Sequence, residues 1–369
     1  MQTAAGRTAL TLGGAMVDTI VILENETVER ISLKNAHRSY LLLEEGQKAD
    51  TRMIEQHAGG GGMNTAVSFA RLGFSTAIIA KFGRDQKAEM LRSTLVREKI
   101  DASFVRDTDR LGTGSSVLVL AHERNAAVFT YRGSNGLLEP VDLVPAAFAR
   151  DLVYVAGLSN ASADHFPAIV DLARRNGAFV AANPGARQLS TRSDEIWKTI
   201  GKLSLLSLNS DEMALMLPRL VAESGSIATA PAPSGGQMPW LLGRGLVKDS
   251  LHLGLLDAMR VLIEAGVGVV VVTDGARGAY AASRGRMIFC PALEGNVQGT
   301  TGAGDAFSST FAASMALGAS LEEALRRATL NAKSVVEVVD AQSGLLQAAA
   351  LDSALELHGH EMKLCEWSL

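Results

Sequence analysis

Short apolar runs alternate with amphipathic segments through most of this chain, and after residue 150 the alternation becomes regular. We predict strands at residues 152–156, 178–182, 203–208 and 269–272, and helices at residues 164–175 and 211–217. Strands that are apolar along their whole length, separated by amphipathic helices, are typical of a parallel sheet that is buried on both faces. The pattern therefore predicts an α/β protein.

The first 150 residues and one later stretch depart from this regular pattern. The predicted elements are strands at 9–12 and 76–81, helices at 65–72 and 86–99, short strands at 28–33 and 40–43, and a hairpin with arms 115–121 and 126–131. The short strands and the hairpin look like strands outside the main alternation. Residues 220–249 have no periodicity, which indicates either a disordered insertion or a functional flap.

Charge and cysteine content narrow the class of protein. The 369 residues carry 35 basic and 39 acidic side chains, a net charge of −4, which argues against a surface for nucleic acid or anionic membrane. Cys290 and Cys365 form neither a disulfide framework nor a metal-ligand spacing. The N-terminus does not resemble a signal peptide, and no apolar segment is long enough to span a membrane. We expect a soluble cytoplasmic protein.

Residues 299–307, Gly-Thr-Thr-Gly-Ala-Gly-Asp-Ala-Phe, follow a predicted extended segment at 286–293 and precede a predicted helix at 306–317. Glycines let the backbone pass close to a ligand, and free N–H groups at a helix start favour an anion. Asp305 adds a carboxylate beside that site, as phosphoryl transfer to an alcohol requires. A glycine-rich turn capped by an aspartate is an equal alternative at this point.

A second glycine run lies at residues 58–62 and opens the predicted helix at 65–72. No Gly-Lys-Ser or Gly-Lys-Thr follows it, so it is not a P-loop. Asp18 lies just after the first predicted strand, near the edge where open α/β sheets bind ligands. Taken alone, the glycines are a helix entry that needs backbone clearance, and Asp18 is a turn residue.

Both glycine motifs resemble the signatures of the ribokinase-like (phosphofructokinase-B) family of carbohydrate kinases. The family forms are Gly-Gly-x-Gly-x-Asn, matched at residues 59–64, and Asp-Thr-Thr-Gly-Ala-Gly-Asp-Ala-Phe, matched at 299–307 except at Gly299. The resemblance covers nearly the whole chain apart from residues 220–249. It implies one domain over residues 1–369, with a three-layer, mainly parallel Rossmann-like sheet and a small β lid from about 20–55 and 113–135.

The resemblance also implies roles for the matching residues. Asp305 would be the base, and Gly302, Ala303 and Gly304 would form the hole for the transferring phosphoryl group. The residues expected to bind the sugar are Asp18, Gly59, Gly60, Asn64 and Asn135. An asparagine in a turn usually serves only the turn, which is the alternative for Asn135.

ATP and Mg²⁺ are the cofactors that the resemblance implies. The residues expected on the nucleotide side are Asn209, Thr273, Gly275, Gly278 and Asn331, and Glu212 is expected to hold Mg²⁺ through water. The alternatives are a helix cap for Asn209, a plain hairpin turn at 273–278 and a solvated position for Asn331. The family aspartate that Gly299 replaces often helps to bind a monovalent cation, so we expect weak or absent activation by K⁺.

The sequence therefore predicts an ATP-dependent kinase that phosphorylates a hydroxyl of a sugar or sugar-like polyol. Its partners would be a small sugar, polyol or nucleoside, with no nucleic acid or membrane, and an exposed lid sheet suggests a homodimer. One alternative is a nucleoside or sugar-phosphate kinase, for which Lys48, Arg52 and Arg132 are candidates to bind a substrate phosphate. A catalytically silent regulator that binds sugar or nucleotide is the other.

Overall fold

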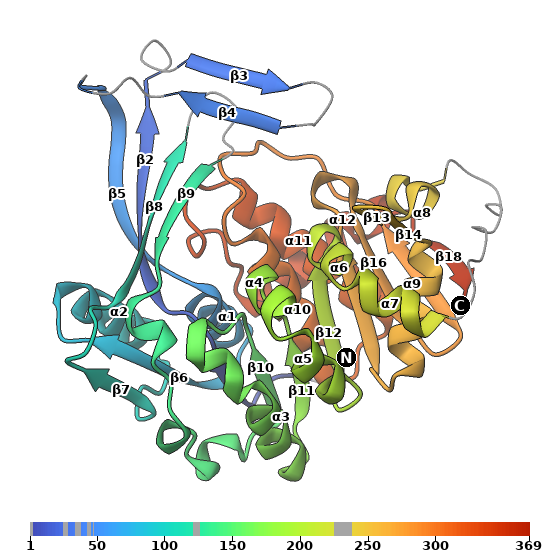
Figure 1. The fold of residues 1–369 in the computed structure, drawn as a ribbon, viewed down its shortest axis with the longest axis horizontal. Coiled ribbons are helices and arrows are strands. Elements are labelled where there is room, and N and C mark those ends of the chain that lie inside the picture. Colours follow the sequence, from blue (N-terminus) through green and yellow to red (C-terminus); the bar gives the residue numbers. More distant parts are fainter. Residues whose placement is uncertain are drawn as a thin grey trace.

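A ten-stranded sheet runs through the computed structural model, which describes residues 3–24, 29–33, 38–42, 46, 48–120, 126–224 and 238–369 (Figure 1). Going across this sheet from β7 to β15, each strand pairs in parallel with the next, whereas the neighbours from β15 to β18 pair antiparallel. In order across the sheet, the strands are β18 (Cys365–Ser368), β17 (Arg286–Cys290), β16 (Ala279–Ser283), β15 (Val269–Thr273), β12 (Leu205–Asn209), β11 (Phe179–Ala182), β10 (Leu152–Val155), β1 (Thr8–Leu12), β6 (Ser75–Gly83) and β7 (Val105–Thr108).

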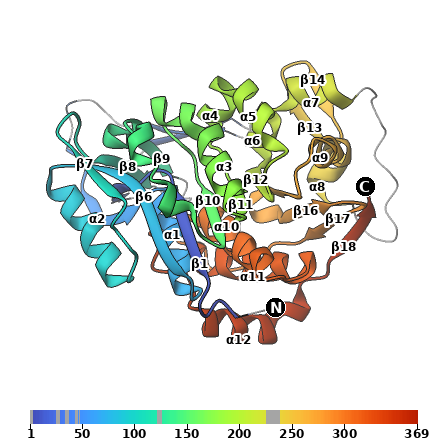
Figure 2. The ribbon, with the colours of Figure 1, turned by 90° about the horizontal axis from the view of Figure 1, so that it is seen from below.

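Helices cover both faces of this sheet, so the predicted three layers are confirmed (Figure 2). In β10, Val153 and Val155 join one hydrophobic core and Leu152 and Tyr154 join the other, which explains the continuous apolar run. One face carries α3 (Phe166–Arg175), α5 (Ser193–Ile200), α7 (Leu217–Ser224) and α9 (Leu255–Glu264). The other carries α1 (Gly61–Arg71), α10 (Ala303–Ala316), α11 (Leu321–Val336) and α12 (Ala348–His358). Helix α2 (Gln86–Arg97) packs near β6.

A separate four-stranded sheet stands over one end of the body (Figure 1). Its strands, in order, are β5 (Thr51–Gly59), β2 (Met16–Leu23), β8 (Gly114–Leu120) and β9 (Ala126–Tyr131), and a hairpin of β3 (Glu29–Leu33) and β4 (Arg38–Leu42) lies beyond them. Ile20, Leu118 and Leu120 on one face of this sheet are buried and pack against Val339. The predicted turn at 122–125 and residues 28 and 43 lie outside the described residues.

The two glycine motifs differ from prediction in where their helices begin. Helix α1 starts at Gly61 rather than at residue 65, because Gly60 is its N-cap with a φ of 91°. Helix α10 starts at Ala303 rather than at residue 306, because Gly302 is its N-cap with a φ of 82°. Each glycine motif is therefore the first turn of a helix as well as the loop before it.

The stretch predicted to lack regular structure is partly ordered. Helix α7 continues to Ser224, and α8 (Trp240–Arg244) precedes β13 (Leu246–Lys248), which pairs with β14 (Leu251–Leu253). The rest of the predicted insertion, residues 225–237, lies outside the described residues. Among the helices described, none combines the length and the apolar character needed to cross a bilayer.

Candidate active site

The start of α10 presents free backbone amides. Gly302 has a left-handed backbone, and a Cβ added there would lie 2.5 Å from the Cβ of Ala341, so only glycine fits this turn. The N–H of Ala303 makes only a long hydrogen bond of 3.4 Å to the Thr300 carbonyl. Those of Gly304 and Asp305 have no partner within the described part of the chain. Free N–H groups at the positive end of a 14-residue helix favour an anion.

Asp305 lies in the first turn of α10 and makes no helix-capping bond, so the alternative that it only caps this helix is not supported. Its Oδ2 accepts a hydrogen bond of 2.8 Å from Nδ2 of Asn64, on α1. The Oδ1 of Asn64 in turn accepts one of 3.0 Å from Nε2 of Gln342. Burial raises the pKa of Asp305, and the bond from Asn64 partly opposes this shift.

Asp18 is a second carboxylate close to Asp305, and it is the more deeply buried of the two. It lies within β2 of the small sheet, not in a turn, and its Oδ1 accepts a hydrogen bond from the Ser116 hydroxyl on β8. Burial raises the pKa of Asp18, and the negative charge of Asp305 adds to the shift. A Cβ on Gly59 would lie 1.9 Å from the Asp18 Oδ2, so glycine is required there to leave room for this carboxylate.

Two residues predicted to contact sugar also make contacts within the protein. A Cβ on Gly60 would lie 2.5 Å from the Gly14 carbonyl oxygen, so this glycine permits a close backbone contact between α1 and the β1–β2 connection. The side chain of Asn135 accepts from the Ala15 N–H and donates to the Ala15 carbonyl, both at 3.0 Å. The amide oxygen of Asn135 and one of its N–H groups therefore hold the backbone that leads to Asp18, and its contact with sugar stays a prediction.

On the other side of the α10 start lies a cavity of about 380 Å³. Four residues predicted to bind nucleotide line it together with Ala303 and Gly304; they are Asn209, Thr273, Gly275 and Gly278. The remaining wall is mostly apolar and includes Ala292, Leu293, Val297, Phe307, Ala332 and Val336. The β15–β16 connection is a hairpin turn and also a wall of this cavity, so the two interpretations of residues 273–278 are compatible.

Asn209 and Glu212 form a capping box at the start of α6 (Ser210–Leu215). The Asn209 side chain accepts from the Glu212 N–H at 2.8 Å, and Oε2 of Glu212 accepts from the Asn209 N–H at 3.0 Å. Burial raises the pKa of Glu212, with a contribution from the charge of Asp305, while the hydrogen bond from the Asn209 N–H and the amide of Asn183 oppose the shift. Glu212 therefore lies near enough to Asp305 for the two charges to interact.

Asn331 lies away from the lining of the cavity. The sequence predicts it on the nucleotide side or in a solvated position, but it is fully buried on α11 and is not among the residues that line the cavity. Its Nδ2 donates to the Thr310 hydroxyl at 2.7 Å, and its Oδ1 accepts from the Leu346 N–H at 2.9 Å. The side chain therefore ties α10 to the segment after α11. Thr329 and Lys333, on either side of it along α11, line the cavity instead.

Sequence reasoning missed Gln342 and Ser116, which orient Asn64 and Asp18, and Asn183, whose amide helps to set the pKa of Glu212. The only local signal was at Gln342, which follows Asp340 in a turn where the Asp340 Oδ1 accepts from the Gln342 N–H at 2.8 Å. The partners of all three come from distant parts of the chain. Their roles depend on the fold and not on a local pattern.

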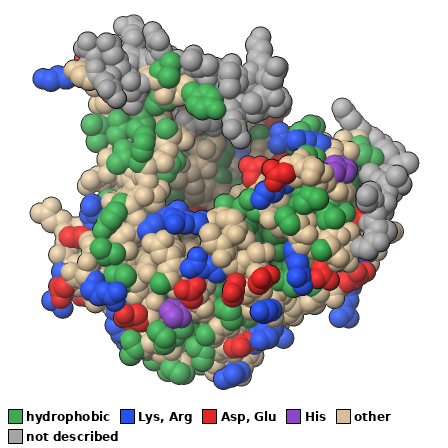
Figure 3. Space-filling view, viewed as in Figure 1, with side chains coloured by type: hydrophobic (Ala, Val, Ile, Leu, Met, Phe, Trp, Pro, Cys, Tyr) green, Lys and Arg blue, Asp and Glu red, His purple; other side chains and the backbone are tan. Residues whose placement is uncertain are grey.

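A hollow lies between the four-stranded sheet and the body of the protein (Figure 3). Asp18 and Ser116 belong to strands of that sheet, whereas Asn64 and Asp305 belong to helices of the body. The geometry thus brings two carboxylates, an amide and a set of free N–H groups together at the start of α10, where Ala303 and Gly304 also line the 380 Å³ cavity. Such an arrangement can bind a polyhydroxylated molecule and activate one of its hydroxyls beside an anion.

Residues 26–238 and 246–348 match the model of the pfkB family of carbohydrate kinases. The chain belongs to this family, whose members transfer a phosphoryl group to a sugar hydroxyl, and it is an α/β carbohydrate kinase as the sequence predicts.

Among curated relatives, the chain is 27% identical to a ribokinase from Mus musculus over 77% of this chain and 80% of that protein. It is 28% identical to a fructokinase from Klebsiella pneumoniae over 71% of this chain and 78% of that protein.

Solved structures share the fold. The ribokinase from Arabidopsis thaliana, solved with ribose and ATP, has a TM-score of 0.69 at 19% identity, with 95% of this chain and 99% of that chain covered. The adenosine kinase from Sinorhizobium meliloti has a TM-score of 0.71 at 19% identity, with 95% and 100% covered.

Proposed function

We propose that this carbohydrate kinase uses ATP to phosphorylate a hydroxyl of a sugar or sugar-like polyol, with Asp305 as the general base. The observation that carries the proposal is the position of Asp305, which is bonded to Asn64 on the side of Asp18 and adjoins the free amides of α10. The relatives named ribokinase and fructokinase support a pentose or hexose as substrate.

In the proposed reaction, Asp18 accepts hydrogen bonds from two hydroxyls of the substrate and so orients it. Asp305 takes the proton of the reacting hydroxyl as its oxygen forms a bond to the γ-phosphorus. The bond from that phosphorus to the bridging oxygen breaks, and its electron pair leaves with ADP. The N–H groups of Gly304 and Asp305, with that of Ala303, stabilise negative charge on the phosphoryl group.

ATP would occupy the 380 Å³ cavity, with its base between apolar walls and its phosphates toward Ala303 and Gly304. Asn209 would contribute through the shape of the α6 start, because its side chain is engaged in the capping box. Use of ATP is also the reason that we place the enzyme in the cytoplasm.

Glu212 fits a role in holding Mg²⁺ through water. One of its oxygens is bonded to the Asn209 N–H, and the carboxylate lies near Asp305. The described residues contain no group of three or more acidic, histidine or cysteine side chains that would hold a metal by themselves. A single carboxylate is compatible with Mg²⁺, which keeps several waters and binds substrate phosphates. When bound, the ion would neutralise charge on the phosphates of ATP.

The four-stranded sheet would act as the lid of a single domain and exclude water when substrate binds. Its inner face carries Asp18 and Ser116, whereas its outer face exposes apolar side chains. On that outer face, Ile54 is 62% exposed, Val117 40% and Phe129 63%. Exposed apolar patches mark interaction surfaces, so we also propose that this face pairs with a second copy in a homodimer.

A screen of ADP release over pentoses, hexoses, inositols, nucleosides and sugar phosphates tests the proposed function. An Asp305→Asn protein purified in parallel controls for contaminating kinases. We expect at least one neutral or anionic sugar to support ADP release by the wild type and not by the variant. If no member of the panel stimulates ADP release above the variant, the function is contradicted, and a sugar- or nucleotide-binding regulator is favoured.

A further inference from the structure

A second hollow, of about 600 Å³, lies beside the proposed sugar site and is rich in arginine. Its lining includes Arg132, at the end of β9, and Arg187 and Arg192, which lie within and just after α4 (Ala186–Thr191). Basic side chains are visible on the face of the molecule below the four-stranded sheet (Figure 3). Three guanidinium groups from two distant segments therefore share one concave surface.

Two of these charges are not neutralised by the protein. Arg192 pairs with Asp164 at 3.0 Å, but neither the Arg132 guanidinium nor the Arg187 guanidinium has an ion-pair or hydrogen-bond partner among the residues that the structure describes. Arg132 is exposed at the rim of the hollow, where partial loss of solvent lowers the pKa of its guanidinium and the positive charge of Arg187 lowers it further. The two guanidinium groups thus repel each other, and an anion between them would relieve that repulsion.

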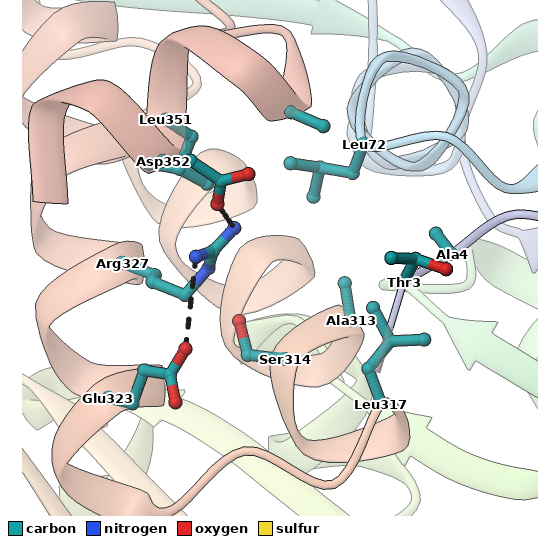
Figure 4. Close-up of a pocket in the computed structure, with 11 residues that line it drawn as sticks. Thr3, Ala4, Leu72, Ala313, Ser314, Leu317, Glu323, Arg327, Leu351 and Asp352 are labelled. Carbon is teal, nitrogen blue, oxygen red and sulfur yellow. Dashed lines mark ion pairs between the residues drawn. The ribbon is translucent and has the colours of Figure 1, made fainter. Parts of the chain in front are cut away.

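Another pocket of this chain shows the contrasting arrangement (Figure 4). It lies between the N-terminal segment and helices α10 to α12, and its arginine is Arg327. The guanidinium of Arg327 lies 2.6 Å from an oxygen of Asp352 and 3.8 Å from one of Glu323. The charge of Arg327 is paired within the protein, so this guanidinium does not favour binding of an anion in the pocket.

The arginine-lined hollow adjoins the proposed sugar site. Its lining residue Gly157 directly follows Ala156. A Cβ built on Gly61 would lie 3.1 Å from the Ala156 Cβ and 3.4 Å from the Asp305 Oδ1. At its other end, Arg132 directly precedes the turn η2 (Gly133–Gly136), which contains Asn135 and contacts the backbone leading to Asp18. A small molecule with one hydroxyl at Asp305 therefore has this hollow within its reach.

We propose that Arg132 and Arg187 bind an anionic group on the sugar substrate, a carboxylate or a phosphate, remote from the hydroxyl that is phosphorylated. This inference rests on the proposed function and specifies the substrate class as acidic or phosphorylated sugars. The planar fork of guanidinium donors suits either anion. Of the three cations considered from the sequence, Arg132 lines the hollow, and Lys48 and Arg52 do not.

The first test compares sugars of the same carbon skeleton in three forms: neutral, with a terminal carboxylate and with a terminal phosphate. We expect kcat/KM for one anionic form to exceed that for the neutral sugar. Arg132→Gln or Arg187→Gln should lower kcat/KM for that form by about 10- to 100-fold, the value of a charge-assisted hydrogen bond, and leave the neutral sugar little changed. Arg175→Gln, an exposed change of the same charge on α3, is the matched control. The preferred anionic form shows whether the natural substrate carries a carboxylate or a phosphate at this site.

The second test does not depend on catalysis. Inorganic phosphate should raise the thermal midpoint of the wild type and of Arg175→Gln more than that of Arg132→Gln or Arg187→Gln. The comparison with the variants is needed because phosphate also has access to the amides of α10. If no sugar is phosphorylated but this difference persists, the anion site stands and the proposed function fails. If neutral sugars are phosphorylated preferentially and the variants match the wild type in both tests, the anion site is overturned.

Discussion

Gly302 offers a sharp test of how the anion site is built. Gly302 and Gly318 flank the two ends of α10 with nearly equal φ angles, 82° and 80°. An alanine at either position must adopt a left-handed backbone, which costs about 1–2 kcal/mol. At Gly318 the added Cβ meets no atom within 4 Å, whereas at Gly302 it lies 2.5, 2.7 and 2.9 Å from atoms of Ala341. Overpacking of this kind costs about 1–3 kcal/mol more.

We therefore expect Gly318→Ala to lower the free energy of unfolding by about 1–2 kcal/mol and Gly302→Ala by about 2–5 kcal/mol, the sum of the two costs. Only Gly302→Ala should also impair the enzyme, because relief of the overlap must move the first turn of α10. A displacement of about 1 Å at a reacting centre can cost about 10²-fold in rate. Urea denaturation and ADP-release assays on both variants measure the two effects.

Gly304→Ala separates stability from catalysis. Its added methyl group would meet no protein atom within 4 Å, and alanine is favoured over glycine inside a helix by about 0.5–1 kcal/mol. This variant should be as stable as the wild type or more so, yet slower, because the methyl group enters the space assigned to the phosphoryl group.

The reasoning about Gly302 is refuted if Gly302→Ala and Gly318→Ala have equal stability and activity. It is also weakened if Ala341→Gly fails to restore any stability to Gly302→Ala.

Three other predictions concern pH, cations and the core. Because burial raises the pKa of Asp305, kcat should fall with decreasing pH at a higher pH than for an ordinary aspartate. Asn64→Leu removes the donor that lowers this pKa, so the acid limb of kcat should move to still higher pH; an unmoved limb would assign it to another group. Gly299 provides no carboxylate, so rates in KCl and NaCl should agree, and a strong K⁺ dependence would contradict this expectation. Asn331→Leu leaves the Thr310 hydroxyl and the Leu346 N–H without this hydrogen-bond partner. It should reduce the free energy of unfolding by about 1–3 kcal/mol for each of these groups and leave the KM for ATP unchanged. A raised KM with normal stability would instead restore a role at adenine.

The fold was largely predictable because both of its signals are local. A strand buried on two faces must be apolar throughout, as Leu152–Val155 is, and a helix between two strands must be amphipathic. The starts of α1 and α10 were predicted too late, because Gly60 and Gly302 adopt backbone angles that depend on contacts with Gly14 and Ala341. Those contacts join distant parts of the chain and leave no trace in local periodicity.

Candidate site residues can be named from the sequence where a residue type has few uses. Asp305 follows three closely spaced glycines, a combination that has few chemical uses. Gly59 is required for a steric reason, because the buried carboxylate of Asp18 leaves no room for a Cβ there. Asparagine is ambiguous, because its amide binds backbone, side chains and ligands equally well. Asn64 points to Asp305, whereas Asn135 and Asn331 bind other parts of the protein. Arg187 went unnoticed because only the folded chain brings it near Arg132.

Asp305→Asn tests the central claim most directly when kcat and the free energy of unfolding are measured on the same protein. The raised pKa of Asp305 means that its ionised form is disfavoured in the fold, so at neutral pH the neutral amide should not reduce stability. We predict a kcat lower by roughly 10²–10⁴-fold, the usual contribution of a general base, with unchanged or greater stability. A kcat within a few-fold of the wild type would contradict the role of this carboxylate.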